Sequence, residues 1–191
     1  MNQTYIIEHL EPELYEWCLI EYKEISKISG KENLWFSNIN PKDKKKLEAY
    51  GKVLPQSIKR IKLNSACVLD PNSDIALTPD DAKKFKYFIF GGILGDYPPK
   101  QRTKAELTPF IKDAEARNIG KEQLSTDNAV LVTKLIANGA PLEKIKFQNG
   151  LDIKINEIES THLPFRYPLI NNKPHISQEL VDYIKKDEAI S

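Results

Sequence analysis

The chain has 191 residues, with 28 basic and 27 acidic side chains and a formal net charge of +1 at pH 7. This near balance does not point to a nucleic-acid-binding protein. Cys18 and Cys67 are too few for a disulfide framework or a cysteine zinc site, and no apolar run approaches the roughly 20 residues that span a membrane, so we expect a cytoplasmic protein with no membrane association and no metal.

Strand and helix signals alternate along the first half of the chain. Pro12 suits the first turn of a helix, and apolar residues then recur at helical spacing up to Gly30. Asn40 and Pro41 begin a second, lysine-rich helix that Gly51 ends. Strands are predicted at Tyr5–Glu8, Leu34–Ile39 and Ala66–Leu69.

The second half contains a well-defined helix start at Thr78, which precedes Pro79 and two aspartates. Thr103 and Glu106 fit a capping box, but Pro109 requires the helix that follows to be short or broken. The segment Ala114–Ile119 fits either a helix or a strand. The remaining predictions are a strand at Tyr87–Phe90, a helix from Thr126 to about Asn138, a strand at Ile153–Ile158 and a helix at about Gln178–Lys186.

This alternation predicts an α/β fold with a mostly parallel sheet flanked by helices. At this length, one domain over residues 1–191 is the simplest organisation. We expect residues 163–191 to form a C-terminal tail and helix that pack on that domain.

The most informative motif is a glycine loop that follows the apolar run Phe88–Phe90. Gly91, Gly92 and Gly95 lie within five residues and precede Asp96. Glycine lets the backbone approach a ligand at the carboxyl end of a strand, where open α/β sheets bind small molecules. The spacing fits neither a P-loop nor the Rossmann dinucleotide motif. The alternative is a tight turn that needs glycine for backbone reasons alone.

A second candidate site is the polar loop Gly120–Asp127, which leads into the predicted helix at Thr126. Free backbone N–H groups at a helix N-terminus can bind a carboxylate or a ribose. A plain helix cap without a ligand explains the same residues equally well.

A third candidate is the acidic segment that precedes His162. If this segment is extended, Glu157 and Glu159 lie on one face, where paired carboxylates can hold a guanidinium or share a proton. Two solvated acids are the simpler explanation. His162 has no Asp or Cys at metal-ligand spacing, so we interpret it as structural.

Together these segments resemble the SPOUT class of methyltransferases. The chain is similar, more narrowly, to the branch whose yeast member is a protein arginine methyltransferase acting on a small-subunit ribosomal protein, a branch also labelled as RNA methyltransferase. The similarity covers most of the chain from about residue 65 to 180. It is carried by Ala66–Pro71, by Phe90–Asp96 with Pro98-Pro99 and Arg102-Thr103, by Gln123–Val130, and by Glu159 with Leu163–Tyr167.

The resemblance implies a SPOUT-like fold whose C-terminal part forms a deep trefoil knot, with S-adenosylmethionine bound among the knot loops. It therefore favours a strand at Ala114–Ile119. The cofactor-binding residues that it implies are Leu69, Gly91, Gly92, Ile93, Leu94, Gly95, Ile119, Gly120, Gln123, Leu124, Ser125 and Thr126.

An arginine is a poor nucleophile because its guanidinium stays protonated near neutral pH, so carboxylates must orient it. We expect Asp96 and Glu159 to be catalytic, and Glu157 and Arg166 to bind the substrate. Arg166 can alternatively form a structural ion pair. Similar tRNA purine methyltransferases have an aspartate where this chain has Gly95, so their base-catalysis role does not transfer directly.

Three functions fit the resemblance. The first is S-adenosylmethionine-dependent methylation of an arginine of a ribosomal protein, with a ribosomal subunit as partner. The second is base methylation of tRNA or rRNA, which the basic segments 42–46 and 59–62 support through RNA contact. The third is a binding module that keeps the cofactor pocket without catalysis. A monomer is favoured over a dimer, because residues 163–191 could cover the surface that similar enzymes use to dimerise.

Overall fold

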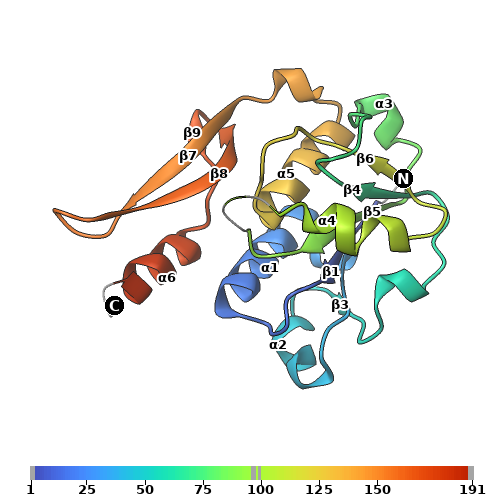
Figure 1. Ribbon diagram of the computed structural model, residues 1–191, viewed down its shortest axis with the longest axis horizontal. Coiled ribbons are helices and arrows are strands. Elements are labelled where there is room, and N and C mark those ends of the chain that lie inside the picture. The colour runs from blue at the N-terminus through green and yellow to red at the C-terminus, as the bar shows by residue number, and fades with distance from the viewer. Residues whose placement is uncertain (1–2, 96–97, 99, 189–191) are drawn as a thin grey trace.

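Six parallel strands form the main sheet of the protein (Figure 1). The computed structural model describes residues 3–95, 98 and 100–188. The strands are β1 (Thr4–His9), β2 (Leu34–Ser37), β3 (Lys52–Val53), β4 (Ala66–Leu69), β5 (Tyr87–Gly92) and β6 (Glu115–Arg117). Their order is β3–β2–β1–β5–β4–β6, and every pairing is parallel. The mostly parallel sheet is therefore confirmed, and the ambiguous segment at 114–119 contains a strand.

The helices are short apart from three that reach beyond two turns. They are α1 (Glu16–Ser29), α2 (Lys44–Leu47), α3 (Pro79–Ala82), α4 (Arg102–Glu106), α5 (Thr126–Ala137) and α6 (Gln178–Glu188). Single turns of 3₁₀ helix are η1 (Lys31–Asn33), η2 (Pro41–Asp43), η3 (Ile58–Arg60), η4 (Thr108–Phe110) and η5 (Leu142–Lys144). Among the described residues, no helix is both long and apolar enough to cross a lipid bilayer.

Both faces of the parallel sheet are covered, because successive residues of a strand point to opposite sides. Ile7 of β1 packs in one buried cluster with side chains of α1 and α5. Ile6 packs in a second cluster on the other face with Leu107 and Ile111, which flank η4. Burial on both faces explains why β5 reads as a continuous apolar run without polar alternation.

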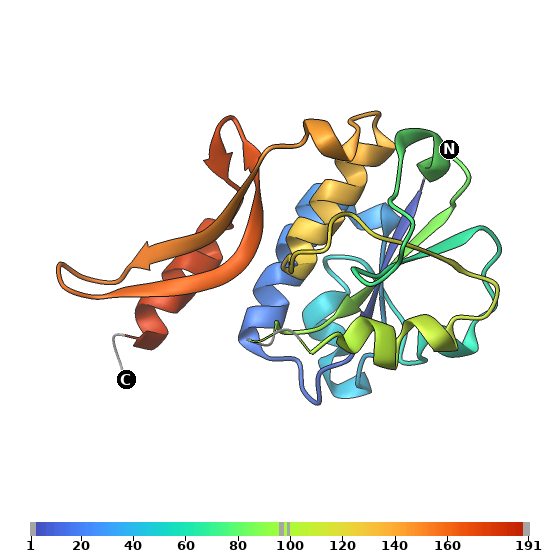
Figure 2. The same cartoon turned by 45° about the horizontal axis from the view of Figure 1, so that its top comes forward.

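A smaller antiparallel sheet lies on the outer side of α1. Its strands are β7 (Phe147–Lys154), β8 (Ser160–Ile170) and β9 (Lys173–Pro174). Apolar side chains of this sheet and of α6 form a cluster with Trp17 and Ile20 of α1. Figure 2 shows the β7–β8 hairpin projecting from the body, with α1 and α5 between it and the parallel sheet. The tail predicted from residue 163 thus begins inside β8, and its helix is present as α6.

Several local predictions are confirmed by the contacts that form. The hydroxyl of Thr78 accepts the N–H of Asp81 at 3.2 Å and caps α3. The helix predicted from Thr126 is present as α5, and the helix near Pro109 is short, as expected. The capping box is wrong, because α4 begins at Arg102 and Glu106 binds that guanidinium at 2.8 Å instead of the helix start.

The predicted helix start at Pro12 is wrong, because α1 begins only at Glu16. The backbone N–H of Leu10 donates to the carbonyl of Gly92 at 3.1 Å, continuing the pairing of β1 with β5. The carboxylate of Glu11 then accepts the N–H of Leu94 at 2.9 Å. These tertiary hydrogen bonds hold residues 10 and 11 against the glycine loop and outside the helix.

The predicted strand at 153–158 is correct only as far as Lys154, where β7 ends. The side-chain oxygen of Asn156 accepts the N–H groups of Ile158 and Glu159, both at 2.9 Å. Asparagine commonly forms such side-chain turns. Glu157 and Glu159 therefore lie in a turn instead of on one face of an extended segment.

Candidate functional site

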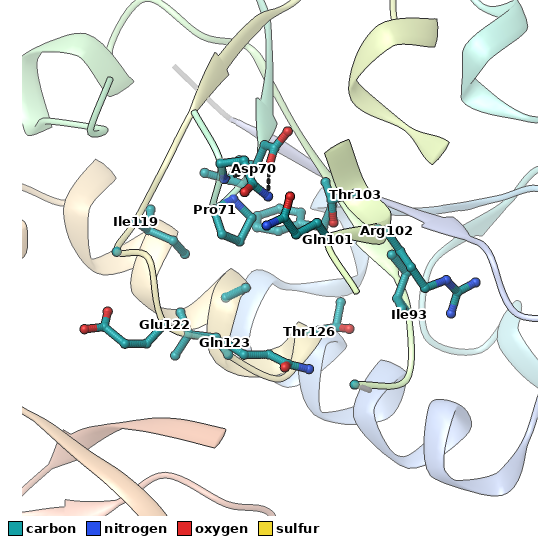
Figure 3. A pocket seen from close by; sticks show the side chains of 18 of the residues that line it. Asp70, Pro71, Ile93, Gln101, Arg102, Thr103, Ile119, Glu122, Gln123 and Thr126 are labelled. Atoms are coloured by element: carbon teal, nitrogen blue, oxygen red, sulfur yellow. Dashed lines mark hydrogen bonds between the residues drawn. The ribbon is translucent and has the colours of Figure 1, made fainter. Parts of the chain in front are cut away.

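A cavity of about 250 Å³ opens at the carboxyl ends of β4, β5 and β6 (Figure 3). The three strands are neighbours in the sheet, and this edge is where open α/β sheets bind small molecules. The cavity walls come from the chain after β4, the glycine loop after β5, the start of α4, the loop after β6 and the start of α5. The two loops singled out in the sequence thus face one cavity.

The glycine loop approaches other chain segments too closely for a side chain at Gly95. A Cβ atom there would collide with the side chain of Gln123 and the ring of Phe165. The N–H of Leu94 is fixed by the Glu11 carboxylate, as described above. The loop is thereby held against the loop after β6 on one side and the end of β1 on the other.

Arg166 of β8 anchors the loop after β6. Its backbone N–H donates to the carbonyl of Gln123 at 2.8 Å, and its guanidinium lies 2.5 Å from the Glu122 carboxylate. The guanidinium also stacks on Phe147, 4.0 Å from the ring centroid. Arg166 does not line this cavity, and it forms an ion pair with Glu122.

Asp70 organises the wall that follows β4. Its buried carboxylate accepts the N–H of Asn72 at 2.8 Å and the hydroxyl of Thr108 at 2.7 Å. Its own N–H donates to the carbonyl of Arg117 at 2.8 Å. One residue at the cavity wall therefore ties together β4, β6 and η4.

Two carboxyl groups are buried behind the start of α5. Trp17 Nε1 donates to Glu21 at 2.8 Å, and the Ser125 hydroxyl donates to Asp127 at 2.6 Å. Burial, and then the nearby Asp127 charge, raise the pKa of Glu21 to about 8. Burial also raises the pKa of Asp127, but its hydrogen bonds from Ser125 and the N–H of Asn128 favour the ionised form.

Nine of the twelve expected cofactor-binding residues line the cavity. From β4 and the glycine loop these are Leu69, Gly91, Ile93 and Gly95. From the loop after β6 and the start of α5 they are Ile119, Gly120, Gln123, Leu124 and Thr126.

The other three expected residues do not line it. A Cβ on Gly92 would collide with the buried Tyr22 hydroxyl, so this glycine serves packing against α1. Leu94 packs on the main core, and the Ser125 hydroxyl is engaged by Asp127.

The expected catalytic pair is not assembled in the described part of the chain. Asp96 lies outside the described residues. Glu157 and Glu159 are exposed in the turn between β7 and β8, at the end of the projecting hairpin, and neither lines the cavity (Figure 1). The amide of Asn156 donates to the Glu159 carboxylate at 2.8 Å. The structure therefore does not bring Glu159 to the cavity.

Some lining residues were missed by the sequence analysis, including Asp70, Asn72, Gln101 and Thr103. Asp70 directly follows a predicted strand, and this position was a usable signal. Gln101 has a left-handed backbone, with φ of 52°, and no pattern in the sequence marks it. Figure 3 shows the neighbouring Arg102 guanidinium pointing away from the cavity; it reaches Glu11 at 2.6 Å.

The cavity combines apolar walls with polar groups, and charged residues such as Asp70, Lys121 and Glu122 also line it. Leu69, Ile119 and Leu124 offer surfaces for a flat ring, while the amides of Gln101 and Gln123 offer hydrogen-bond donors and acceptors. Within the described ranges, no three His, Cys, Asp or Glu side chains gather as a metal site requires. This donor set suits a nucleoside-like ligand.

Comparison with known proteins shows similarity over nearly the whole chain. Residues 4–191 match the family model described as SFM1-like, protein arginine N-methyltransferase SFM1-like. Protein arginine N-methyltransferase SFM1 of Saccharomyces cerevisiae is 36% identical over 206 residues, which cover 98% of this chain and 96% of the yeast protein.

Solved structures give the same result. The crystal structure of the yeast arginine methyltransferase SFM1 complexed with SAM has a TM-score of 0.90 and 38% identity, covering 99% of this chain and 92% of that one. A dual-specific Trm10 from Thermococcus kodakaraensis has a TM-score of 0.60 and 14% identity, covering 74% of this chain and 96% of that one. This second similarity concerns the fold alone.

Proposed function

The chain belongs to the SFM1-like family of protein arginine N-methyltransferases, and from this premise we propose that it transfers a methyl group from S-adenosylmethionine to an arginine of a ribosomal protein. The observation that carries the proposal is the cavity at the carboxyl ends of β4, β5 and β6, because the glycine loop and the loop after β6 meet there. The crystal structure of yeast SFM1, which matches this chain over nearly its whole length, is of the enzyme complexed with SAM.

The residues of the cavity fit the cofactor. Glycine at position 95 lets the loop pack closely against Gln123 and Phe165, and Gly91 forms part of the cavity wall without a side chain. We assign the apolar walls to the adenine, and Gln101 and Gln123 to the polar groups of the cofactor. When bound, S-adenosylmethionine supplies a methyl group activated by a positively charged sulfur.

Methyl transfer from such a sulfur is an in-line displacement, so the protein contributes mainly by positioning the acceptor nitrogen. An arginine acceptor carries a proton at neutral pH and must lose it during or after transfer. We propose Asp96 as the carboxylate that orients the guanidinium, because it directly follows Gly95 of the glycine loop. We retain Glu159 as a second proposed catalytic group, and Glu157 and Arg166 as proposed substrate contacts, each to be tested separately.

The setting of the reaction is also a proposal. A ribosomal protein as substrate and a monomeric enzyme follow from the resemblance stated for the sequence, as does the trefoil knot. We propose the cytoplasm because both cysteines are free and buried, and disulfide bonds are rare in that compartment.

The test is transfer of radiolabelled methyl groups to ribosomal subunits, with protein and RNA fractions separated afterwards. We expect label in one protein band and, after acid hydrolysis, in methylarginine. Label in RNA would replace the proposal by base methylation. No label, together with cofactor binding measured by calorimetry, would indicate a binding module.

A further inference from the structure

The segments 58–64 and 100–112 carry seven basic residues and a single acidic one, in a chain whose two charge types nearly balance. The single acid, Glu106, is already paired with Arg102. We call the surface formed by five of these cations and one aromatic ring the basic face. Its members are Lys59, Arg60, Lys62, Lys104, Phe110 and Lys112.

The two segments of the basic face lie side by side although they are far apart in sequence. Lys59 Nζ lies 5.2 Å from the ring centroid of Phe110. Ile58 and Leu63 share one buried cluster with Leu107 and Ile111, so η3 and η4 pack on the same face of the parallel sheet. Above this shared hydrophobic base, Lys59 is half-buried and the other four cations are exposed.

The basic face carries charges that the described part of the chain does not pair. Within the described ranges, no carboxylate forms an ion pair with any of its five cations. Asp113 and Glu115 follow directly along the chain, and Glu115 is engaged by Arg117. By contrast, the other basic run, at 42–46, contains Asp43, which pairs with Lys46 at 2.8 Å.

Phe110 distinguishes this surface from an ordinary solvated charge cluster. Its side chain is 52% exposed, among the largest exposures of an apolar side chain in the described residues. Cations that follow a phosphate backbone, together with an exposed aromatic ring on which a base stacks, are the combination found in single-strand binders. An acidic protein partner would need only the cations, and the exposed ring of Phe110 would have no role in binding it.

The basic face also adjoins the cavity. Residues 100–103 line the cavity wall, and α4 leads from there to Lys104 and η4. We propose that the basic face binds single-stranded RNA, so that an RNA-containing substrate is held with its protein component beside the cavity. The inference concerns a surface outside the cavity, and its test does not depend on methyl transfer.

The test uses the whole protein and a fluorescein-labelled oligouridylate of about 12 nucleotides, within the usual site size of single-strand binders. Fluorescence anisotropy at several salt concentrations gives the affinity and its salt dependence. We expect binding whose affinity falls with salt, with a slope of about 0.7 for each phosphate contacted. A parent protein that binds phosphatidylserine vesicles but not this RNA would overturn the proposal.

Charge reversal locates the binding site. The variant Arg60→Glu/Lys62→Glu/Lys104→Glu should weaken RNA binding at least tenfold and reduce the salt slope. The matched control, Lys42→Glu/Lys44→Glu/Lys45→Glu, makes the same charge change at exposed positions of the other basic run and should stay within twofold of the parent. Equal losses in both variants would show nonspecific electrostatic attraction and overturn the proposal.

A second pair of variants tests the aromatic ring without changing charge. Phe110→Ala should weaken binding about fivefold or more, whereas Phe110→Tyr, which keeps a stacking surface, should retain it. All four substituted positions, Arg60, Lys62, Lys104 and Phe110, are exposed, so the variants should fold, as circular dichroism and thermal melting would verify. Unchanged binding in Phe110→Ala would contradict the stacking role.

Discussion

The guanidinium of Arg102 lies 2.6 Å from the carboxylate of Glu11, a residue 91 positions earlier in the chain. The same carboxylate oxygen accepts the N–H of Leu94 at 2.9 Å. Glu11 therefore fixes the glycine loop and the start of α4, two walls of the cavity, to the end of β1. We infer that this pair keeps the cavity in shape before a ligand arrives.

Glu11→Gln should weaken S-adenosylmethionine binding while leaving the protein folded. The amide oxygen can still accept the Leu94 N–H, but the charge that holds Arg102 is lost. Hydrogen bonds to charged groups contribute about 1.5–3 kcal/mol, so we expect a rise in Kd of roughly tenfold in calorimetric titration. Glu13→Gln, an exposed neighbour, is the control and should bind like the parent. Equal affinity in both variants would show that the pair does not shape the cavity.

Gly95→Ala should abolish cofactor binding, because the added methyl group would collide with Gln123 and Phe165. The control is Gly139→Ala, where nothing lies within 4 Å but φ is +104°. That substitution should cost about 1 kcal/mol of stability through backbone strain and leave the affinity unchanged. Calorimetric titration combined with thermal melting separates the two effects, and intact binding in Gly95→Ala would contradict a ligand at the glycine loop.

The buried Glu21 should make the protein less stable as the pH rises. Its pKa is raised from 4.5 in an exposed carboxyl to about 8, so between these values the folded chain holds a proton that the unfolded chain has lost. The stabilisation from this group is complete below about pH 4.5 and is lost as the pH rises to about 8, at no more than about 1.4 kcal/mol per pH unit.

Glu21→Gln should remove this pH dependence, because its amide oxygen still accepts the Trp17 hydrogen bond but does not titrate. Urea unfolding at pH 6, 7, 8 and 9 would compare the slopes. The exposed Glu16→Gln on the same helix should keep the slope of the parent. A parent whose stability does not fall over this range would show that Glu21 is already ionised.

Asp96→Asn should reduce kcat by orders of magnitude and leave S-adenosylmethionine binding nearly intact, since the amide cannot carry the charge that orients a guanidinium. Steady-state methylation with separate calorimetry measures both quantities. Full activity would exclude Asp96 from the reaction.

Glu159→Gln distinguishes two roles for the hairpin turn. As the second proposed catalytic group, Glu159 should lower kcat when it loses its charge, at unchanged cofactor affinity. The control Glu143→Gln, exposed in η5, should behave like the parent. A raised KM for the protein substrate with kcat unchanged would instead assign Glu159, exposed in the hairpin turn, to substrate binding.

Local signals in the sequence were sufficient for the parallel sheet and for the two loops of the cavity. The apolar run before Gly91 marks a strand buried on both faces, and the glycines mark a close approach. They could not reveal which segments approach Gly95, because Gln123 and Phe165 are brought there by the fold. The predicted ends of a helix and a strand were wrong for the same reason. The hydrogen bonds of Glu11 delay the start of α1, and the side-chain turn of Asn156 follows the end of β7, although the apolar periodicity extends further in both places.

The sequence by itself determined the α/β class, the family and the region of the cavity, since periodicity, glycine spacing and motif order are properties of neighbouring residues. Only the tertiary structure decided which side chains meet one another. It placed Arg166 in an ion pair with Glu122, left Glu159 at a hairpin turn and assembled the basic face from two distant segments. Such contacts depend on long-range packing and hydrogen bonds, which no local pattern encodes.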